Sequence, residues 1–295
     1  MKNVILFDFN NLAVRTFFVK DIGAATVNPD YGLWRFMTFD SIYRSLFRVR
    51  NANEIVLAVD DRRSWRKLYF KRYKESRKLK RDKSNINWPD FYKSLEDFVL
   101  TIKDNIPVKV IRIDNAEADD IIAAICMNRK DNFTIISTDE DFLQLSSPTV
   151  KIYNPRKKEH TVCEDTEKFI VTKSLTGQAK DDIFNIKTPL DWGQTPETLG
   201  KRKPGFGPKS AEKVLKEGYM EWLKDNDLGE RFKINRVLMD FNYIPNILQK
   251  RIMNEYLGYE YPNPDNMYGF CKRYGFRGYT ENYQQFENTF LRMYN

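Results

Sequence analysis

Short apolar runs alternate with longer amphipathic stretches over the first 165 residues, and this pattern constrains the fold more than any other. Five runs rich in Val, Ile and Phe are typical of buried strands: residues 4–7, 54–59, 108–113, 133–137 and 150–153. Three intervening stretches have the apolar spacing of helices: residues 33–49, 91–105 and 116–129. Strands alternating with helices predict an α/β fold with a central, mostly parallel sheet flanked by helices.

Strand patterns fade after about residue 165, and helical patterns dominate to the C-terminus. A chain of 295 residues is long enough for two domains. We predict an α/β domain over residues 1–165 and a helical domain over residues 166–295. The polar residues 79–90 have little apolar periodicity, and we expect them to be mobile.

Composition excludes several classes of protein. Hydrophobic residues make up 41% of the chain, which is too many for a disordered protein. No stretch of about eighteen apolar residues predicts a membrane span, and no secretory leader is recognisable. The three cysteines are far apart and form no Cys-x-x-Cys motif, so a disulfide framework or a zinc site is not expected. These features favour a cytoplasmic location, and the single histidine, His160, disfavours a Ser-His-Asp hydrolase.

Positive charge is concentrated in one segment. Residues 62–83 contain twelve Lys or Arg and two acidic residues, a net +10, whereas the whole chain carries +8. Aromatic residues, among them Trp65 and Tyr73, lie between these cations. A solvated helix is the alternative explanation, but such a helix would mix charges of both signs. Charge of one sign with interleaved rings favours a nucleic acid, whose phosphates and bases both find partners there.

A second basic cluster lies at residues 201–216, around the sequence Gly205-Phe206-Gly207-Pro208-Lys209. Glycines let a backbone approach closely, and the helix expected after Pro208 offers N–H groups to a phosphate. An ordinary loop into a helix is the alternative. The candidate DNA-binding residues of both regions are Arg62, Arg63, Lys71, Arg72, Tyr73, Lys201, Lys203, Gly205, Gly207, Lys209 and Lys213.

Carboxylates follow four of the five predicted strands. They are Asp8, Asp60, Glu117, Asp119, Asp120, Asp139 and Asp141. Helix capping explains one or two of them, but the carboxyl ends of parallel strands share one edge of a sheet, so all seven should converge and repel one another. Oxygen-only ligands suit Mg²⁺ or Mn²⁺, and a pair of such ions can activate water and stabilise both oxygens of a phosphodiester.

These motifs, in this order, resemble the 5′ nuclease family, which includes flap endonucleases. Leu6-Phe7-Asp8-Phe9, residues 117–123 and residues 137–145 resemble its acidic motifs. Residues 65–77 resemble the basic helix leading into its arch, here expected around residues 62–95. Residues 200–217 resemble its helix-hairpin-helix, also called helix-three-turn-helix, which in relatives binds duplex DNA and a monovalent cation. Residues 231–245 are most similar to the branch formed by the ribonuclease H of T-even bacteriophages.

The resemblance implies a metal-dependent 5′→3′ exonuclease and flap endonuclease that clears primers during replication. For two Mg²⁺ or Mn²⁺ ions, it assigns the first site and the region between the two sites to Asp8, Asp60, Glu117, Asp119, Asp120 and Asp139. It assigns the second site to Asp141 and Asp181, assisted by Asp182. Arg66, Lys74 and Arg77 would hold the scissile phosphate, and Tyr73 would stack on a base.

The implied partners are branched or nicked duplex DNA and RNA–DNA hybrids with a 5′ end or 5′ flap, a single-strand-binding protein and a sliding clamp. A monomer without membrane attachment is expected.

One position departs from the family pattern. Relatives carry Gly-Asp-x-x-Asp, whereas this chain has Gln178 in place of the first aspartate and Asp181 as the second. A glutamine offers a neutral oxygen, so a weaker second metal site is expected. Two alternatives stay open: a structure-specific DNA-binding protein that has lost its metal, and a PIN-type ribonuclease, which lacks the basic arch and the glycine loop.

Overall fold

The computed structural model of this chain describes residues 1–19 and 29–293. By internal contacts these residues form two compact units. Unit 1 comprises Met1–Arg63, Asn85–Val162 and Asn246–Asn295, and unit 2 comprises Ser64–Ser84 and Cys163–Pro245. These units group residues by contact and not by chain order. The division into domains at residue 165 therefore stays a prediction.

The sheet of unit 1 has the order β3-β2-β1-β4-β5-β6. Its strands are β1 (Asn3–Asp8), β2 (Glu54–Ala58), β3 (Lys109–Ile111), β4 (Asn132–Ile136), β5 (Val150–Asn154) and β6 (Glu159–Thr161). The first five run parallel, which confirms the predicted fold class. Sequence analysis misses β6, an antiparallel strand paired with β5, because its three polar residues carry no apolar signal.

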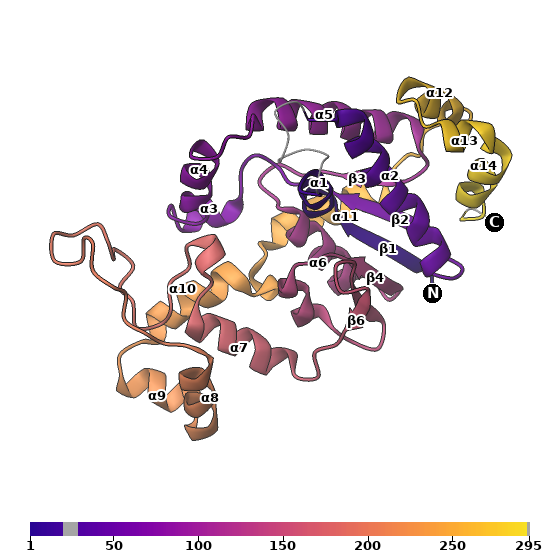
Figure 1. Cartoon of the computed structure of the whole chain (residues 1–295). Coiled ribbons are helices and arrows are strands. Elements are labelled where there is room, and N and C mark those ends of the chain that lie inside the picture. The colour runs from indigo at the N-terminus through magenta and orange to yellow at the C-terminus, as the bar shows by residue number, and fades with distance from the viewer. Residues whose placement is uncertain (20–28, 294–295) are drawn as a thin grey trace. The chain divides into compact units, whose positions relative to one another are not determined.

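Both faces of the sheet are buried, because Val4, Ile5 and Leu6 are consecutive in β1 and each is 0% exposed. Ile5 and Phe7 belong to a large core with side chains of α1 (Phe9–Phe17), α2 (Tyr31–Arg48) and α5 (Trp88–Asn105). Side chains alternate between faces along a strand, so Val4 and Leu6 need a second layer. Helix α6 (Ala118–Asn128), which packs against β1, β2 and α11 (Asn246–Leu257), provides it (Figure 1).

The last helices of unit 1 form an aromatic cluster on α2. They are α12 (Asn266–Arg273), α13 (Arg277–Glu281) and α14 (Tyr283–Leu291). Phe39 of α2 lies with its ring centroid 4.9 Å from that of Phe270, 5.8 Å from Phe276 and 6.0 Å from Phe286. Rings at these separations interact favourably beyond the area they bury. The aromatic residues therefore attach the C-terminal helices to the α/β unit.

Unit 2 is helical. Its elements are α3 (Trp65–Tyr69), α4 (Glu75–Asp82), α7 (Thr166–Thr176), η2 (Ala179–Asp181), α8 (Pro208–Glu217), α9 (Tyr219–Asp225), α10 (Gly229–Met239) and η3 (Phe241–Tyr243). Val171 of α7, Ala211 and Val214 of α8 and Leu223 of α9 form its apolar core. Helices α7 and α8 thus pack together, although a long connection that contains the glycine loop (residues 205–209) separates them in the chain. Of residues 79–90, which we expect to be mobile, residues 79–82 complete α4 and residues 88–90 begin α5, while their mobility stays a prediction.

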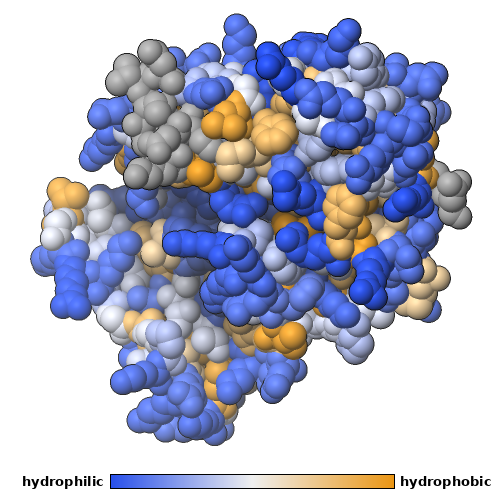
Figure 2. Space-filling model, turned by 45° about the vertical axis from the view of Figure 1, so that its right-hand side comes forward, coloured by the Kyte–Doolittle hydropathy of each residue, from blue (hydrophilic) through white to orange (hydrophobic). Residues whose placement is uncertain are grey.

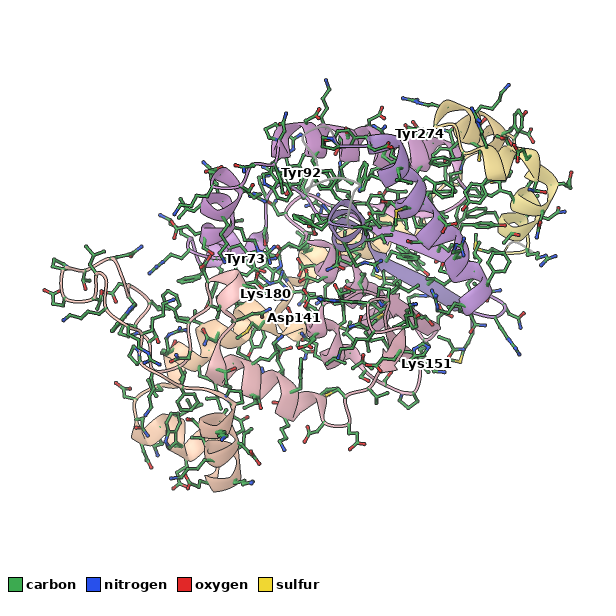
Figure 3. All side chains as sticks on the ribbon, in the orientation of Figure 1. Tyr73, Tyr92, Asp141, Lys151, Lys180 and Tyr274 are labelled. Atoms are coloured by element: carbon green, nitrogen blue, oxygen red, sulfur yellow. The ribbon has the colours of Figure 1, made fainter. Side chains whose placement is uncertain are left out.

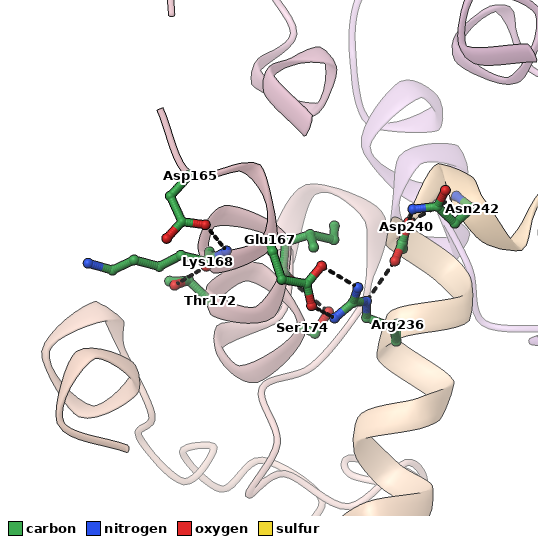
Figure 4. A network of polar contacts seen from close by, with 9 residues as sticks. Asp165, Glu167, Lys168, Thr172, Ser174, Arg236, Asp240 and Asn242 are labelled. Carbon is green, nitrogen blue, oxygen red and sulfur yellow. Dashed lines mark hydrogen bonds and ion pairs between the residues drawn. The ribbon is translucent and has the colours of Figure 1, made fainter. Parts of the chain in front are cut away.

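Polar contacts join α7 and α10 within unit 2. The Arg236 guanidinium donates to both oxygens of Glu167, at 2.8 and 2.9 Å, and to Asp240 at 2.7 Å (Figure 4). Burial alone would lower the pKa of Arg236, but the bonds to Glu167 and Asp240 raise it above its ordinary value. Asn235, which is 0% exposed, donates to the carbonyls of Ser174 and Phe184. Helix α10 therefore positions both α7 and the segment that follows it.

The surface is largely hydrophilic on the face drawn in Figure 2, as expected for a chain with 31% charged residues. Large exposed apolar side chains such as Leu68, Leu199 and Ile247 come from different elements. Among the described residues, no helix is both long and apolar enough to span a bilayer.

A buried ion pair lies inside unit 1. Glu54 is 3% exposed and Lys109 is 6% exposed, and the Lys109 Nζ is 3.4 Å from a Glu54 oxygen. The same ammonium donates to the Tyr256 backbone carbonyl at 2.5 Å and lies 4.1 Å from the centroid of the Tyr256 ring. Burial lowers the pKa of Lys109, and Glu54 opposes this shift. Strands β2 and β3 and helix α11 therefore meet at one paired charge.

We expect Glu54→Gln to lower the free energy of unfolding by about 3 kcal/mol near neutral pH, because the Lys109 ammonium would stay buried without its carboxylate. The pKa of Lys109 would fall further without Glu54. Above that lowered pKa the unfolded chain binds more protons than the folded chain, so the stability of the variant should rise as the pH approaches about 10. Urea unfolding at about pH 7 and about pH 9.5 measures both effects.

Lys2→Gln is the matched control, because the Lys2 ammonium is 3.6 Å from the same carboxylate but its side chain is 56% exposed. Its stability should change by less than about 1 kcal/mol. An equal loss of stability in the two variants would contradict a specific role for the Lys109 pair.

Candidate active site

Backbone N–H groups hold the acids at the carboxyl edge of the sheet in unit 1. Asp8 ends β1 and caps α1, accepting from the Asn11 N–H at 3.0 Å. Asp60 lies two residues beyond β2 and accepts from the Ala118 N–H at 2.7 Å. Aspartate is common in turns and helix caps because its carboxylate accepts hydrogen bonds from the unpaired N–H groups at the start of a helix. The same contacts bring the ends of different strands together.

Three acids form a cluster at the start of α6. Glu117 caps the helix, and its own N–H donates to Asp120 at 2.9 Å in a capping box. Ligand oxygens of Glu117, Asp119 and Asp120 all lie within 4.8 Å of one another. Asp120 is 0% exposed and Glu117 is 8% exposed. Close, buried carboxylates repel unless a cation neutralises them, and this oxygen-only set fits a hard divalent ion.

The end of β4 carries the remaining acids of this unit. Asp139 caps η1 (Glu140–Leu145) and accepts from the Asp141 N–H at 3.0 Å. Asp141 is half-buried (Figure 3). The structure therefore places all seven of the strand-end acids of the sequence analysis in unit 1, after β1, β2, β3 and β4.

Sequence analysis missed the residues that tie these strand ends together. The Asn10 amide oxygen accepts from the Asp60 N–H at 3.0 Å, and the Asn11 amide oxygen accepts from the Thr138 hydroxyl at 3.0 Å. Asp61 accepts from the Asn115 N–H at 2.9 Å. Burial alone would raise the pKa of Asp61, but bonds from backbone N–H groups lower it. The doublets Asn10-Asn11 and Asp60-Asp61, each beside a predicted ligand, were the available signal.

Asp181 and Asp182 belong to unit 2, where they contact the basic segment. Asp181 is 5% exposed and is ion-paired with Arg77. Asp182 accepts from the Ser76 N–H at 2.7 Å. Gln178, which is 9% exposed, pairs through its backbone with Ile183, closing the turn that carries both acids. The turn therefore joins the base of α4.

Three basic-segment residues expected to touch nucleic acid make contacts within unit 2: Arg66 and Tyr73 are buried and Arg72 is half-buried. Arg66 is 1% exposed, and its Nε donates to the Leu238 carbonyl at 2.8 Å. Tyr73 is 3% exposed and belongs to an apolar cluster with Ile170 and Leu238, which leaves little of its ring for a base. Arg72 donates to the carbonyls of Leu190 and Trp192. Their contacts indicate packing and positioning, while the predicted nucleic-acid roles stay predictions.

The other candidate contacts lie at the surface. Lys74 is half-buried in a left-handed conformation, with φ 55°. The exposed residues are Arg62, Arg63, Lys71, Lys201, Lys203, Gly205, Gly207, Lys209 and Lys213. Gly207 caps α8, and Lys209 lies in its first turn. Apart from its adjacent residues, no described atom lies within 4 Å of where a Cβ would stand on Gly205 or Gly207, and neither has a positive φ. The fold itself therefore does not require glycine at either position.

Comparisons with known proteins identify the family. Residues 3–173, more than half of the chain, match the family model described as the 5′-3′ exonuclease N-terminal resolvase-like domain. The chain belongs to this 5′-3′ exonuclease family. Residues 165–286 match the model described as the C-terminal domain of T4 RNase H. The chain is therefore a nuclease that hydrolyses phosphodiester bonds.

Similar proteins support the same family. The ribonuclease H of Enterobacteria phage T4 is 28% identical over 297 residues, covering 97% of this chain and 96% of that protein. The flap endonuclease Xni of Shewanella loihica is 28% identical over 188 residues, covering 60% of this chain and 63% of that protein. The DNA polymerase I of Mycobacterium bovis is 27% identical over 247 residues, and the match spans 25% of its length.

Solved structures show the same fold. The bacteriophage T5 D15 flap endonuclease, in a complex with DNA and metal ions, has a TM-score of 0.65 at 18% identity and covers 87% of this chain and 98% of its own. The T5 5′-exonuclease with bound zinc has a TM-score of 0.58 at 18% identity, with 92% and 98% covered. At this level of identity, the likeness concerns the fold alone.

We expect Asp119→Asn to weaken Mn²⁺ binding about tenfold or more, because one negative charge of the cluster of Glu117, Asp119 and Asp120 is lost. Calorimetric titration of the full chain measures the affinity, and circular dichroism checks that α6 is retained. Asp114→Asn is the matched control: Asp114 lies in the loop that precedes α6, its side chain is 67% exposed, and it is 3.7 Å from Arg251. Equal affinities of Asp119→Asn and wild type would exclude Asp119 as a ligand.

Proposed function

We propose that this nuclease is a divalent-metal-dependent 5′→3′ exonuclease and flap endonuclease on DNA and RNA–DNA hybrids. Its role would be to remove RNA primers and adjacent DNA during replication. The observation that carries the proposal is the carboxylate cluster of Glu117, Asp119 and Asp120, with ligand atoms within 4.8 Å of one another. Asp60, bonded to the Ala118 N–H at 2.7 Å, belongs to the same edge.

Two Mg²⁺ or Mn²⁺ ions, when bound, would supply an activated water and stabilise the charge on the scissile phosphate. Asp8, Asp60, Glu117, Asp119, Asp120 and Asp139 would hold the first ion and line the region between the two ions. The assignment of Asp141, Asp181 and Asp182 to the second ion comes from the family resemblance and stays a prediction. Lys74 and Arg77 would neutralise charge that develops on the phosphate. Arg66, being buried, would act by fixing the segment that carries them.

The glycine loop would bind the duplex. Gly205 and Gly207 have open space around them, so a sugar-phosphate backbone could approach the N–H groups at the start of α8. The exposed Lys201, Lys203, Lys209 and Lys213 would neutralise further phosphates. Several further expectations stay predictions. They are a monovalent cation at this loop, a single-strand-binding protein and a sliding clamp as partners, a monomeric state and a cytoplasmic location.

The two alternative functions differ from the proposal in testable features. A PIN-type ribonuclease would lack the C-terminal domain that residues 165–286 match. A DNA-binding protein without activity would bind a flap substrate but would not cut it in Mg²⁺. Cleavage of a 5′-labelled flap substrate with Mg²⁺, and its loss with chelator, would therefore decide between enzyme and binding protein.

We expect Asp141→Asn to abolish this cleavage while binding of the flap substrate is retained or becomes tighter, because a cation ligand is lost and repulsion of phosphate decreases. Single-turnover cleavage and a binding titration separate the two effects. Glu140→Gln, the exposed acid next to it, serves as the control and should cleave like the wild type. Turnover of Asp141→Asn at the wild-type rate in saturating Mg²⁺ would contradict the assigned role.

A Lys209→Ala variant should weaken binding to duplex-containing substrates. One lost phosphate contact should reduce the slope of log K against log salt concentration by about 0.9. The single-turnover rate on bound substrate should stay unchanged. Lys216→Ala is the control, since Lys216 lies in the last turn of the same helix and pairs with Glu212 at 2.9 Å. An unchanged salt slope together with a slower chemical step would contradict a duplex-binding role for Lys209.

A further inference from the structure

Four contacts tie the base of α4 to the turn that carries Asp181 and Asp182. The Lys74 N–H donates to the Asp181 carbonyl at 2.9 Å, and the Ser76 N–H donates to the Asp182 carboxylate at 2.7 Å. Arg77 donates to the Lys180 carbonyl at 3.3 Å and pairs with the Asp181 carboxylate. Lys74 and Asp182 both have a positive φ, 55° and 59°. Such conformations persist where the surrounding contacts hold them.

Arg77 and Asp181 differ in their exposure. The side chain of Asp181 is 7% exposed, whereas that of Arg77 is 43% exposed. A buried carboxylate needs a positive partner, and the longer, more exposed guanidinium can leave the pair more easily than the carboxylate can. A divalent cation at Asp181 would satisfy the same carboxylate. Because two cations at one carboxylate repel each other, the cation and the guanidinium should compete.

We propose that Arg77 occupies Asp181 in the cation-free protein and that a divalent cation displaces it, so that cation loading releases Arg77 toward the substrate phosphate. This inference rests on the proposed function, in which Asp181 holds the second ion. Arg77 would then do more than contact the phosphate. Its contacts with the turn at residues 180–182 would depend on whether that ion is bound, so binding of the ion would change residues 74–77 at the base of α4.

Thermodynamic reciprocity gives the inference a measurable form. If the guanidinium weakens cation binding, then the cation weakens the hold of Arg77 on the turn by the same factor. Removing Arg77 should therefore tighten the second cation site, although it slows cleavage. Removal of any nearby cation relieves repulsion at the site. Displacement is distinguished from simple repulsion by a change at residues 74–77 when the divalent cation binds.

Mn²⁺ alone, titrated by calorimetry and electron paramagnetic resonance into the full-length protein, tests the inference. Wild type should show a tighter class of site and a weaker one, and Asp181→Asn should lose the weaker class. Arg77→Gln should tighten the weaker class about tenfold and leave the tighter class unchanged. Lys78→Gln removes the next cation of the same helix, which is exposed, and should behave like wild type.

Trypsin cleavage at Lys78 to Lys83 provides a second readout that does not depend on activity. In wild type, Mn²⁺ should accelerate cleavage there, because the base of α4 loses the Arg77 contact. In Arg77→Gln and Asp181→Asn the rate should not respond to Mn²⁺. If circular dichroism shows that Arg77→Gln is misfolded, Arg77→Lys, which keeps the charge but loses the guanidinium fork, should tighten the weaker class by a smaller factor.

Several results would overturn the inference: an unchanged or weaker second class in folded Arg77→Gln, an Asp181→Asn variant that keeps the weaker class, or a trypsin rate in wild type that Mn²⁺ does not alter. The failure of the proposed function would look different. In that case the tighter class itself, or the Mg²⁺-dependent cleavage of a flap substrate by wild type, would be missing.

Discussion

Mutual repulsion among carboxylates is the constraint on which the edge of the sheet in unit 1 depends, and backbone N–H groups relieve it. Asp8, Asp60, Asp120 and Asp139 each accept one such bond, at 2.7 to 3.0 Å. Each donor lies at or just before the start of a helix, where N–H groups lack partners within the helix and the dipole favours negative charge. The acids therefore stabilise the helices while the helices stabilise the acids.

This exchange lets one set of residues serve both the fold and the chemistry. A carboxylate has two oxygens and about four lone pairs, so a capping bond does not exhaust its capacity as a ligand. The bond also restricts the rotamer of the carboxylate, and the capping box does so for Glu117 and Asp120 of the cluster. Asn10 and Asn11 extend the arrangement, because they tie the end of β1 to residues that follow β2 and β4. The edge is thus preorganised by neutral side chains as well as by charged ones.

The sequence predicted the features that depend on periodicity and position. The alternation of apolar runs with helical stretches identified five strands, and the rule that parallel strands end at one edge placed seven acids there. Strand β6 was missed because three polar residues owe their conformation to pairing with β5. No local pattern could show that residues 246–293 pack with unit 1, since residues in contact, such as Phe39 and Phe270, are far apart in the chain.

The basic segment shows why charge alone does not distinguish roles. Arg66, Arg72 and Tyr73 occur in the same run as Arg62 and Lys71, yet the first three pack within unit 2 and the last two are exposed. Arginine suits both uses, because its planar fork binds backbone carbonyls as readily as phosphates. Only the tertiary partners, such as the carbonyls of Leu238 and Leu190, separate a positioning arginine from a substrate contact.

Gln178 fits the charge balance of the turn in unit 2. It is 9% exposed, and its carbonyl accepts from the Asp181 N–H at 3.0 Å. An aspartate at this position, as the family resemblance would place there, would add a third carboxylate to a turn whose buried acid is paired with Arg77. Glutamine keeps an oxygen acceptor but adds no charge, so the turn can stay folded with a single guanidinium when no cation is bound. The same neutrality leaves fewer charges for a cation there than in the cluster of Glu117, Asp119 and Asp120, so the two sites should differ in affinity.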